Sequence, residues 1–542
     1  MTNHSRTIAA QKKSKMRVLI RSSAERAVLG RQFVLPNPGD IIIMLVFGWA
    51  LFCFSLVTLG KRMLVRLAKL AQSDELRETL LNSDQALGIL MISGSVVLVL
   101  MVVTFYKYPR LLLALMVLSL SFGGVGWKPL HDIAIIWKYL GVVFFAAYAA
   151  QSLYKNFWRF VAIPFIRLIL AWLVWMAVVC IFIGGRQDDF WYLGNEIAFL
   201  AGFTITWLYA FNKNYDLKEF YYLISWLALA VIAMQLVSPL VMDSVLVSGR
   251  FVSFYGRATG FSMKIAPLVI VLFWRAMEDK DPRIATIFSV AALIGFALVL
   301  LSGSRSPSAA TLMGVGILWW YFRSRLLFVM LFLAVLGVAA QLVLSAGESG
   351  IISDILGRVE SVNSQEEGRS SIWAAYIEVA ARSPIYGYAP SGKSFAIVGG
   401  ALGEYLAAQG TEVKTAGVHN SFLGITLRFG LVGLSLFLAI IVSAMIRARQ
   451  VLFSTLIPAA EKRIYILPAA LIAVIVFTCF FEDRVPGNGK GEIEQFLLYA
   501  SVVICQFYGS RLINLYERAD TKAKPIKTVD DFNVLPQPTA IT

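Results

Sequence analysis

The stretch IATIFSVAALIGFALVLLSGSRSPSAATLMGVGILWWY covers residues 284–321 and contains a single charged residue, Arg305. One straight helix of this length would extend about 57 Å, whereas the hydrocarbon core of a membrane is about 30 Å thick. The chain must therefore turn near Gly303, with Pro307 suited to start a second helix. We predict two antiparallel membrane helices, with Arg305 at the water surface between them.

The composition extends this interpretation to the whole chain. Of its 542 residues, 58% are hydrophobic and 15% are charged, and the mean hydropathy is +0.71. So little charge could not cover the surface of a soluble domain. The long apolar runs with Trp and Tyr near their ends are typical of helices and not of a β-barrel. We predict an all-α, polytopic membrane helix bundle of about fourteen transmembrane helices.

The apolar runs divide the chain into five regions. We expect a basic cytoplasmic tail (1–40), eleven transmembrane helices (41–345), a large periplasmic loop with short helices (346–418), three further transmembrane helices (419–510) and a disordered cytoplasmic tail (511–542). The predicted spans are 41–59, 86–105, 111–124, 132–151, 161–183, 191–211, 219–240, 262–276, 284–302, 307–322, 325–345, 420–445, 464–481 and 492–510.

The distribution of Lys and Arg gives the orientation. Nearly all turns on one side of the predicted bundle are basic, so that side and both termini are expected in the cytoplasm. Residues 60–85 are the exception, because they carry five Lys/Arg on the other side, where an amphipathic surface helix would fit. The topology of residues 41–130 is thus the least determined part of the scheme.

The net charge of +16 does not by itself indicate a nucleic-acid partner. The basic clusters flank the spans, where they set orientation and contact anionic membrane lipids. All four cysteines lie inside apolar runs and lack the spacing of a metal or redox site. Asp188 and Asp189 form an acidic pair that could hold a metal, but we expect them to lie in a solvated turn, since no second acidic or His cluster is nearby in sequence. We predict no metal, no cofactor and no nucleic acid.

Three arginines on the predicted outer side are candidates for binding an anion. Arg250 and Arg257 lie among aromatic residues in SGRFVSFYGRATGFSMK (248–264), and Arg305 lies beside a helix N-terminus. A guanidinium group binds phosphate bidentately, and backbone N–H groups at a helix start can share the same anion. Anchoring of the same side chains to lipid headgroups is the alternative.

The large loop adds two further candidate regions. Residues 371–382 are expected to form an amphipathic helix that stops before Pro384, with Arg369 just before its start. The loop ends at His419, whose imidazole could transfer a proton to or from a substrate. Its neighbour Asn420 is a good helix N-cap, so the following helix does not need His419 for capping. His131 is the rival base on the same side.

Charged residues inside the spans are expected to have partners. Lys138 and Glu196 lie at a similar depth of about 8 to 9 Å from the outer helix ends, so we predict that they pair or share a polar cavity. Arg428 lies deeper and on roughly the opposite helix face from His419. It is expected to point into the bundle toward a partner that the sequence does not identify.

At these residues the chain resembles the O-antigen ligase and O-antigen or exopolysaccharide polymerase superfamily of bacterial membrane glycosyltransferases. The resemblance covers about residues 256–437. The number of helices predicted for the whole chain exceeds the number expected of the ligase branch. It rests on RATGF (257–261), SGSRS (302–306), Arg369 with Trp373, Pro384 with Gly387, and HNSFL (419–423).

The resemblance implies an inverting, metal-independent transfer of a glycan from undecaprenyl diphosphate. Arg257 and Arg305 would hold the diphosphate and His419 would be the base, whereas Arg250, Arg369 and Asn420 would orient the substrate. A polymerase on the periplasmic face of the inner membrane is the first hypothesis. Transfer to lipid A core by a ligase is the second, and a polysaccharide or lipid transporter is the third. The partners would be the lipid-linked donor, a glycan or lipid-linked acceptor, membrane lipids and a chain-length regulator.

Overall fold

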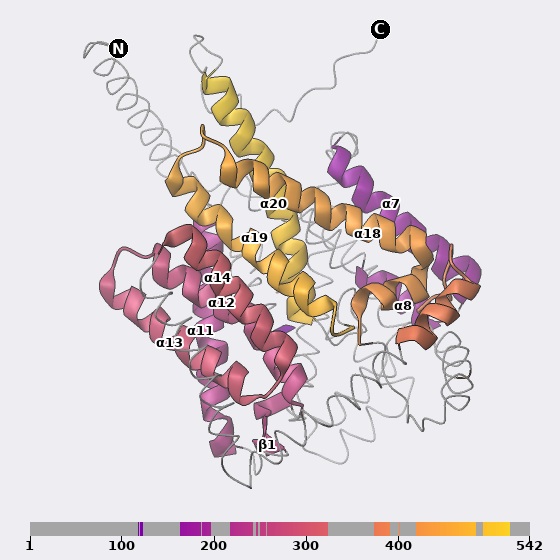
Figure 1. Ribbon diagram of the computed structural model, residues 1–542, viewed down its shortest axis with the longest axis horizontal. Coiled ribbons are helices and arrows are strands. Elements are labelled where there is room, and N and C mark those ends of the chain that lie inside the picture. Colours follow the sequence, from indigo (N-terminus) through magenta and orange to yellow (C-terminus); the bar gives the residue numbers. More distant parts are fainter. Residues whose placement is uncertain are drawn as a thin grey trace, which may run out of the picture.

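The computed structural model describes residues 118, 120–122, 163–185, 187–196, 217–241, 245–247, 250–255, 257–323, 373–390, 400, 419–483 and 492–520. Helices dominate this part of the chain, which confirms the predicted helical membrane bundle (Figure 1). The elements are α7 (Pro164–Val179) with a π-helical end (Cys180–Gly184), α8 (Gln187–Glu196), α11 (Leu217–Val241), β1 (Leu246–Val247), β2 (Arg250–Phe251), a 3₁₀ turn (Ser253–Tyr255), α12 (Ala258–Glu278), α13 (Pro282–Leu301), α14 (Arg305–Phe322), α18 (Ser421–Phe453), α19 (Ala459–Cys479) and α20 (Glu492–Asp520).

Seven of the described helices are long and apolar enough to cross a membrane, so the chain is a multi-pass membrane protein. They correspond to seven of the predicted spans, and the largest differences are that α18 and α20 continue past their predicted ends. Residues 511–520, which were expected to belong to a disordered tail, are therefore helical. Helix α14 occupies the predicted span 307–322 but is not among these seven. Most of the other predicted spans and most of the 346–418 loop lie outside the described residues. The seven helices are Pro164–Gly184, Phe220–Leu240, Ala258–Glu278, Pro282–Leu301, Ser421–Phe453, Ala459–Cys479 and Ile493–Glu517.

The predicted turn in the 284–321 stretch is confirmed. Helix α13 ends at Leu301 and α14 starts at Arg305, with Gly303 in the left-handed region at φ 62°. This backbone conformation favours glycine, so the residue allows the sharp reversal that the length of the apolar run requires. Arg305 is exposed at the turn, as expected.

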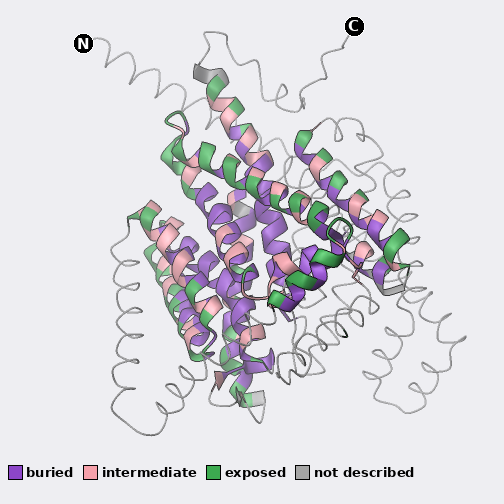
Figure 2. Cartoon of the chain, turned by 45° about the vertical axis from the view of Figure 1, so that its right-hand side comes forward, coloured by how far each residue is buried: buried purple, intermediate pink, exposed green. Residues whose placement is uncertain are grey.

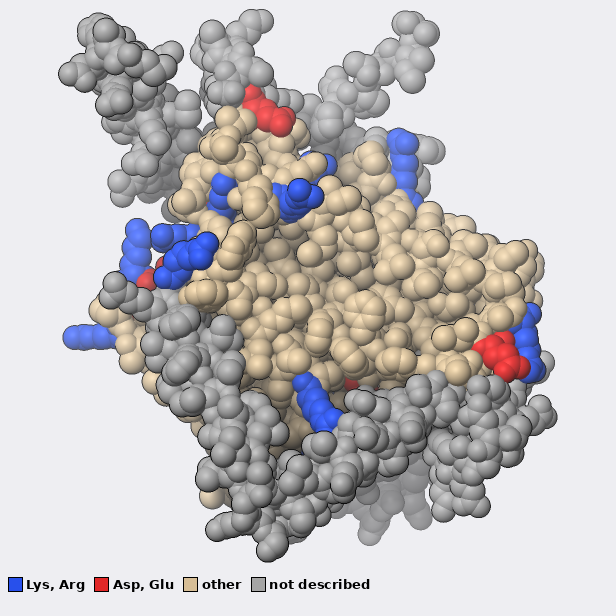
Figure 3. Space-filling model, in the orientation of Figure 1, with Lys and Arg blue, Asp and Glu red and all other residues tan. Residues whose placement is uncertain are grey.

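Helix α12 is the centre of the bundle. Within the membrane-spanning part of α12, 89% of the residues are buried inside the protein, against 39% in α13. Figure 2 shows the same contrast between buried helices in the middle and helices with exposed outer faces. On the face in Figure 3 the described surface is broadly uncharged in the middle, as expected of a surface that contacts lipid.

Two hydrogen bonds show that α19 runs antiparallel to α12 and α14. Near the end of α12, Trp274 donates from Nε1 to the carbonyl of Arg463 near the start of α19, at 2.8 Å. At the end of α14, the Tyr321 hydroxyl donates to the Ala459 carbonyl at 3.3 Å. The starts of α12 and α14 therefore lie at the same end of the bundle as the end of α19.

The start of α18 lies at this end too, because Asn420 Nδ2 donates to the Phe480 carbonyl just after α19, at 3.1 Å. We call the part of the bundle formed by the starts of α12, α14 and α18 and the end of α19 the His419 end.

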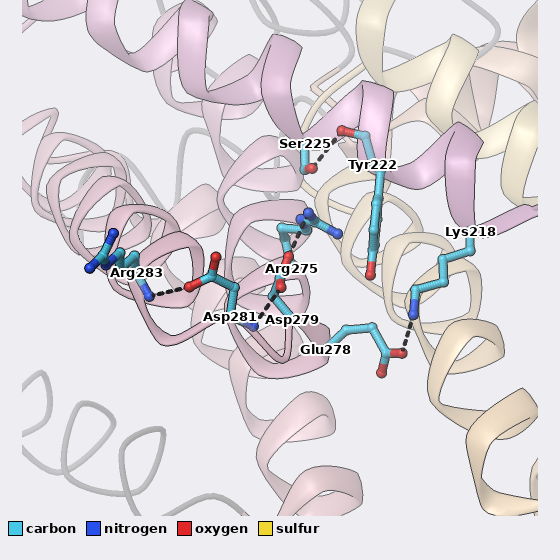
Figure 4. A network of polar contacts seen from close by, with 8 residues as sticks. All are labelled: Lys218, Tyr222, Ser225, Arg275, Glu278, Asp279, Asp281 and Arg283. Carbon is cyan, nitrogen blue, oxygen red and sulfur yellow. Dashed lines mark hydrogen bonds and ion pairs between the residues drawn. The ribbon is translucent and has the colours of Figure 1, made fainter.

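The opposite end is held by a separate network of charges (Figure 4). Lys218 on α11 pairs with Glu278 on α12 at 3.3 Å, and Arg275 pairs with Asp279 at 2.5 Å. The Arg275 guanidinium also lies 3.1 Å from the centre of the Tyr222 ring. These contacts fasten α11 to α12 without involving the His419 end.

Helix α18 is broken at Gly430, where φ is 68° and ψ is −174°. A break in a membrane helix releases backbone groups that cost several kcal/mol each if they stay unpaired in lipid. Here they are paired with α7 and with the loop segment 384–389. The bonds are Tyr388 N to Leu427 O (2.7 Å), Ala389 N to Arg428 O (3.0 Å), Leu431 N to Pro384 O (2.7 Å) and Trp175 Nε1 to Phe429 O (2.8 Å).

The break divides α18 into two halves with different surroundings. Residues 424–430 are all buried, whereas Leu431 and Val432 just after the break are exposed. The second half, residues 431–453, is about 34 Å long and can cross a membrane by itself. The predicted span 420–445 thus contains a break that the sequence analysis did not predict.

Gly430→Ala is expected to destabilise the protein. An alanine Cβ at this position would lie 1.9 Å from the carbonyl oxygen of Ile385, and the backbone conformation alone costs about 1–3 kcal/mol for a residue other than glycine. Thermal unfolding of the protein in detergent should show a clearly lower midpoint. Gly316→Ala in α14 is the matched control, because a Cβ there meets nothing within 4 Å. Equal midpoints for the two variants would contradict the assigned role of the break.

Candidate functional site

His419 lies at the His419 end beside a carboxylate that the sequence did not predict. Its Nδ1 is 3.2 Å from Oε2 of Glu482, which follows α19. The imidazole is 41% exposed, whereas the Glu482 side chain is only 12% exposed. The ring therefore has one nitrogen against a carboxylate and remains accessible to a ligand, which is the arrangement of an oriented base.

Asn420 acts as the N-cap of α18. Its Oδ1 accepts from Leu423 N at 3.0 Å, while its Nδ2 donates to the Phe480 carbonyl. The Ser421 hydroxyl adds a bond to the Glu482 carbonyl at 2.8 Å. Both ends of the Asn420 amide thus make a hydrogen bond at the helix cap, and its contact with a substrate stays a prediction. These contacts fasten the start of α18 to the end of α19.

Arg428 points into the bundle as expected, and its partner is Asp483. The two side chains form an ion pair, and Arg428 Nη1 also donates to the Tyr192 hydroxyl on α8 at 3.3 Å. They are 5% and 14% exposed, so the charges are largely removed from water. Asp483 follows Glu482 directly, and the pair therefore fixes the turn that carries the neighbour of His419.

Glu196 is buried at the same end of the bundle. It accepts hydrogen bonds from Gln495 and from the Tyr499 hydroxyl of α20, the latter at 2.8 Å. The expected partner Lys138 lies outside the described residues. Glu196 thus lies in a polar environment, as predicted. Its hydrogen-bond partners Gln495 and Tyr499 were not predicted from the sequence.

Arg257 and Arg305 are both exposed at helix starts. Arg257 is the N-cap residue of α12, and Arg305 is the first residue of α14. Neither guanidinium has a hydrogen bond or ion pair to the residues that the structure describes. Free guanidinium groups next to the unpaired N–H groups of a helix start are suited to bind an anion.

Arg250 holds the turn that presents Arg305. Its Nε donates to the Ser302 carbonyl at 2.7 Å, and its Nη2 donates to the Ser304 hydroxyl at 3.1 Å. Gly303 leaves room for this side chain, since a Cβ there would lie 3.2 Å from the Arg250 Nε. Arg250, which was predicted to orient the substrate, therefore stabilises the turn between α13 and α14.

The described part of the large loop contains the predicted helix. Residues 373–382 are helical and end before Pro384, as expected. Tyr376 faces inward, and burial raises the pKa of its hydroxyl, with the Asp483 carboxylate acting in the same direction. The helix thus lies over the Arg428–Asp483 pair. Arg369, the candidate before this helix, is outside the described residues.

The expected solvated turn at Asp188 and Asp189 was wrong. Both residues belong to α8, and Asp189 is fully buried, where Gly184 leaves room for its carboxylate. Within the described ranges, no group of three or more His, Cys, Asp or Glu side chains could hold a metal.

Residues 289–438 match the family model described as O-antigen ligase. This part of the chain is therefore similar to the O-antigen ligase family. The match confirms the resemblance to the ligase and polymerase superfamily and implies a glycosyltransferase-like membrane enzyme. The matched residues include Arg305, Arg369, His419 and Asn420, whereas Arg257 precedes them and Glu482 follows them. No curated protein matches the chain in sequence.

Removal of the Arg428 partner, Asp483, is expected to destabilise the protein strongly. Asp483→Ala leaves a buried guanidinium without its carboxylate, which typically costs about 3–5 kcal/mol. Loss of an exposed pair costs about 0–1 kcal/mol, and Arg382 with Glu378 at 2.9 Å is such a pair. Thermal unfolding in detergent should therefore separate Asp483→Ala from the control Glu378→Ala. Similar midpoints for both variants would show that the buried pair does not hold the turn.

Proposed function

We propose that the chain is a glycosyltransferase of the bacterial inner membrane. It would polymerise oligosaccharide repeat units linked to undecaprenyl diphosphate into exopolysaccharide or O-antigen on the periplasmic face. The observation that carries the proposal is the common location of a half-exposed His419 and two exposed arginines, Arg257 and Arg305, at one end of the bundle. This end would face the periplasm, and both termini would lie in the cytoplasm.

The two arginines would bind the diphosphate of the donor. Guanidinium groups form charge-assisted bonds to phosphate oxygens, and the starts of α12 and α14 add backbone N–H donors. Negative charge grows on the diphosphate as it leaves, so donors fixed in advance stabilise the transition state more than the ground state.

His419 would act as the general base. A neutral imidazole takes the proton from the acceptor hydroxyl as its oxygen forms a bond to the anomeric carbon. The bond between that carbon and the diphosphate oxygen breaks on the opposite face, which inverts the configuration. No metal is needed in this scheme. Arg369 remains a proposed substrate-orienting residue, and a chain-length regulator remains a proposed partner.

A ligase that transfers the finished glycan to lipid A core is the second candidate. The family description favours it, because the matched model is named for O-antigen ligase. The two activities share the donor and differ in the acceptor. A polysaccharide or lipid transporter is supported less well, since transporters place binding charges near the membrane midplane, whereas Arg257, Arg305 and His419 lie at one end.

Three alanine variants test the enzyme proposal with purified protein and lipid-linked donor. His419→Ala should lose the contribution of a general base, about 10²–10⁴-fold in rate. Arg257→Ala and Arg305→Ala should each lower the rate by weakening diphosphate stabilisation. EDTA should leave the wild-type rate unchanged. Arg283→Ala, an exposed arginine at the opposite end, is the control. Wild-type rates in all three folded site variants would refute the proposal.

The length of the product separates polymerase from ligase. With donor alone, a polymerase is expected to give a ladder of products that differ by one repeat unit, resolved by gel electrophoresis. If the ladder is absent and a single glycan is attached only when lipid A core is added, the ligase is the correct branch.

A further inference from the structure

Glu482 faces His419 from a second element of the bundle. Its backbone N–H donates to the Thr478 carbonyl at 3.1 Å, which continues the last turn of α19. Its own carbonyl accepts from the Ser421 hydroxyl at 2.8 Å. The backbone N–H and carbonyl of Glu482 are thus both hydrogen-bonded. The side chain that carries the carboxylate therefore starts from a fixed backbone next to the imidazole.

The imidazole is fixed from its own side as well. His419 adopts φ 47°, a left-handed conformation that is uncommon outside glycine. The next residue, Asn420, caps α18 and is bonded to the turn after α19. The contacts of Asn420 therefore fix the backbone at the point from which the His419 side chain extends.

Glu482 has no ion-pair partner other than His419 among the described residues. The adjacent carboxylate, Asp483, is paired with Arg428. An ionised carboxylate only accepts hydrogen bonds, so the nitrogen that faces it must carry the proton. In a neutral imidazole, a protonated Nδ1 leaves the lone pair on Nε2.

We propose that Glu482 is a positioning residue for His419, an inference that rests on the proposed function. Glu482 accepts a hydrogen bond from Nδ1–H and thereby holds the tautomer whose Nε2 is free to act as the base. When the acceptor oxygen attacks the anomeric carbon, its proton moves to Nε2 and the electron pair of the broken bond leaves with the diphosphate. The Glu482 carboxylate then stabilises the imidazolium until the proton passes to water.

This role explains why a carboxylate outside the matched residues 289–438 faces the candidate base. After residue 438, α19 returns the chain to the His419 end. The base and its positioning residue therefore lie next to the start of α18 and the end of α19, which are joined by contacts of His419, Asn420, Ser421 and Arg428.

The tautomer of His419 can be measured without an activity assay. The chain has three histidines, so selective ¹⁵N labelling of histidine gives few ring signals, and His419→Asn identifies those of residue 419. In alkaline buffer, where an ordinary imidazole is neutral, the wild type should carry its proton on Nδ1. Glu482→Ala should lose this preference. Glu482→Gln should retain it, because the amide oxygen still accepts a hydrogen bond.

Glu378→Ala is the control, since it also removes a carboxylate, but one that is exposed and pairs with Arg382. The tautomer of His419 in this variant should match the wild type. In the transfer assay, Glu482→Ala should lower kcat by about 10-fold or more with KM nearly unchanged, as expected for loss of an oriented base and not of a binding group.

The results distinguish failure of this inference from failure of the proposed function. If His419→Ala transfers glycan at the wild-type rate, the proposed function is wrong. If His419→Ala is inactive but Glu482→Ala keeps both the Nδ1–H tautomer and the wild-type kcat, only the positioning role is wrong. A wild-type protein with its proton on Nε2 would also overturn the positioning role.

Discussion

The break of α18 at Gly430 is the constraint on which the rest of the His419 end depends. A membrane helix can stop in the bundle only if other groups replace its lost hydrogen bonds. Here the loop segment 384–389 and Trp175 of α7 supply them. The large loop is thereby fastened to the bundle, and the helix of residues 373–382 is held above the Arg428–Asp483 pair. The break at Gly430 thus determines where the loop segment 384–389 is bound.

A second consequence of the break is that the first half of α18 need not face lipid. It can carry Arg428, whose charge would be costly at a lipid-exposed position, and pair it with Asp483. Asp483 directly follows Glu482 in the chain. Asn420 and Ser421, which contact the residues after α19, directly follow His419. The polar contacts at the start of α18 therefore also fix the position of the His419 imidazole relative to the Glu482 carboxylate.

The sequence predicted those features that depend on local patterns. The length of the 284–321 run required a turn, and the proline at residue 384 ended the loop helix. It did not reveal Glu482 or Asp483 as partners, because each is more than fifty residues from the side chain it contacts. The break at Gly430 was missed for a different reason. A glycine in an apolar pattern is compatible with a continuous helix, and only the contact with Ile385 makes it necessary.

In the proposed function, the fixed positions of groups at the His419 end would favour catalysis. Groups that stabilise developing charge are most effective when they need no reorganisation during the reaction. The turn before Arg305 is held by Arg250, and the residue beside His419 is held by α19, so the supporting contacts are made by side chains that do not need to reach the substrate. Among the described residues, Arg257 and Arg305 have no hydrogen bond or ion pair at their helix starts. In the proposed function, the paired polar groups hold the site in place, and these two guanidinium groups bind the anionic donor.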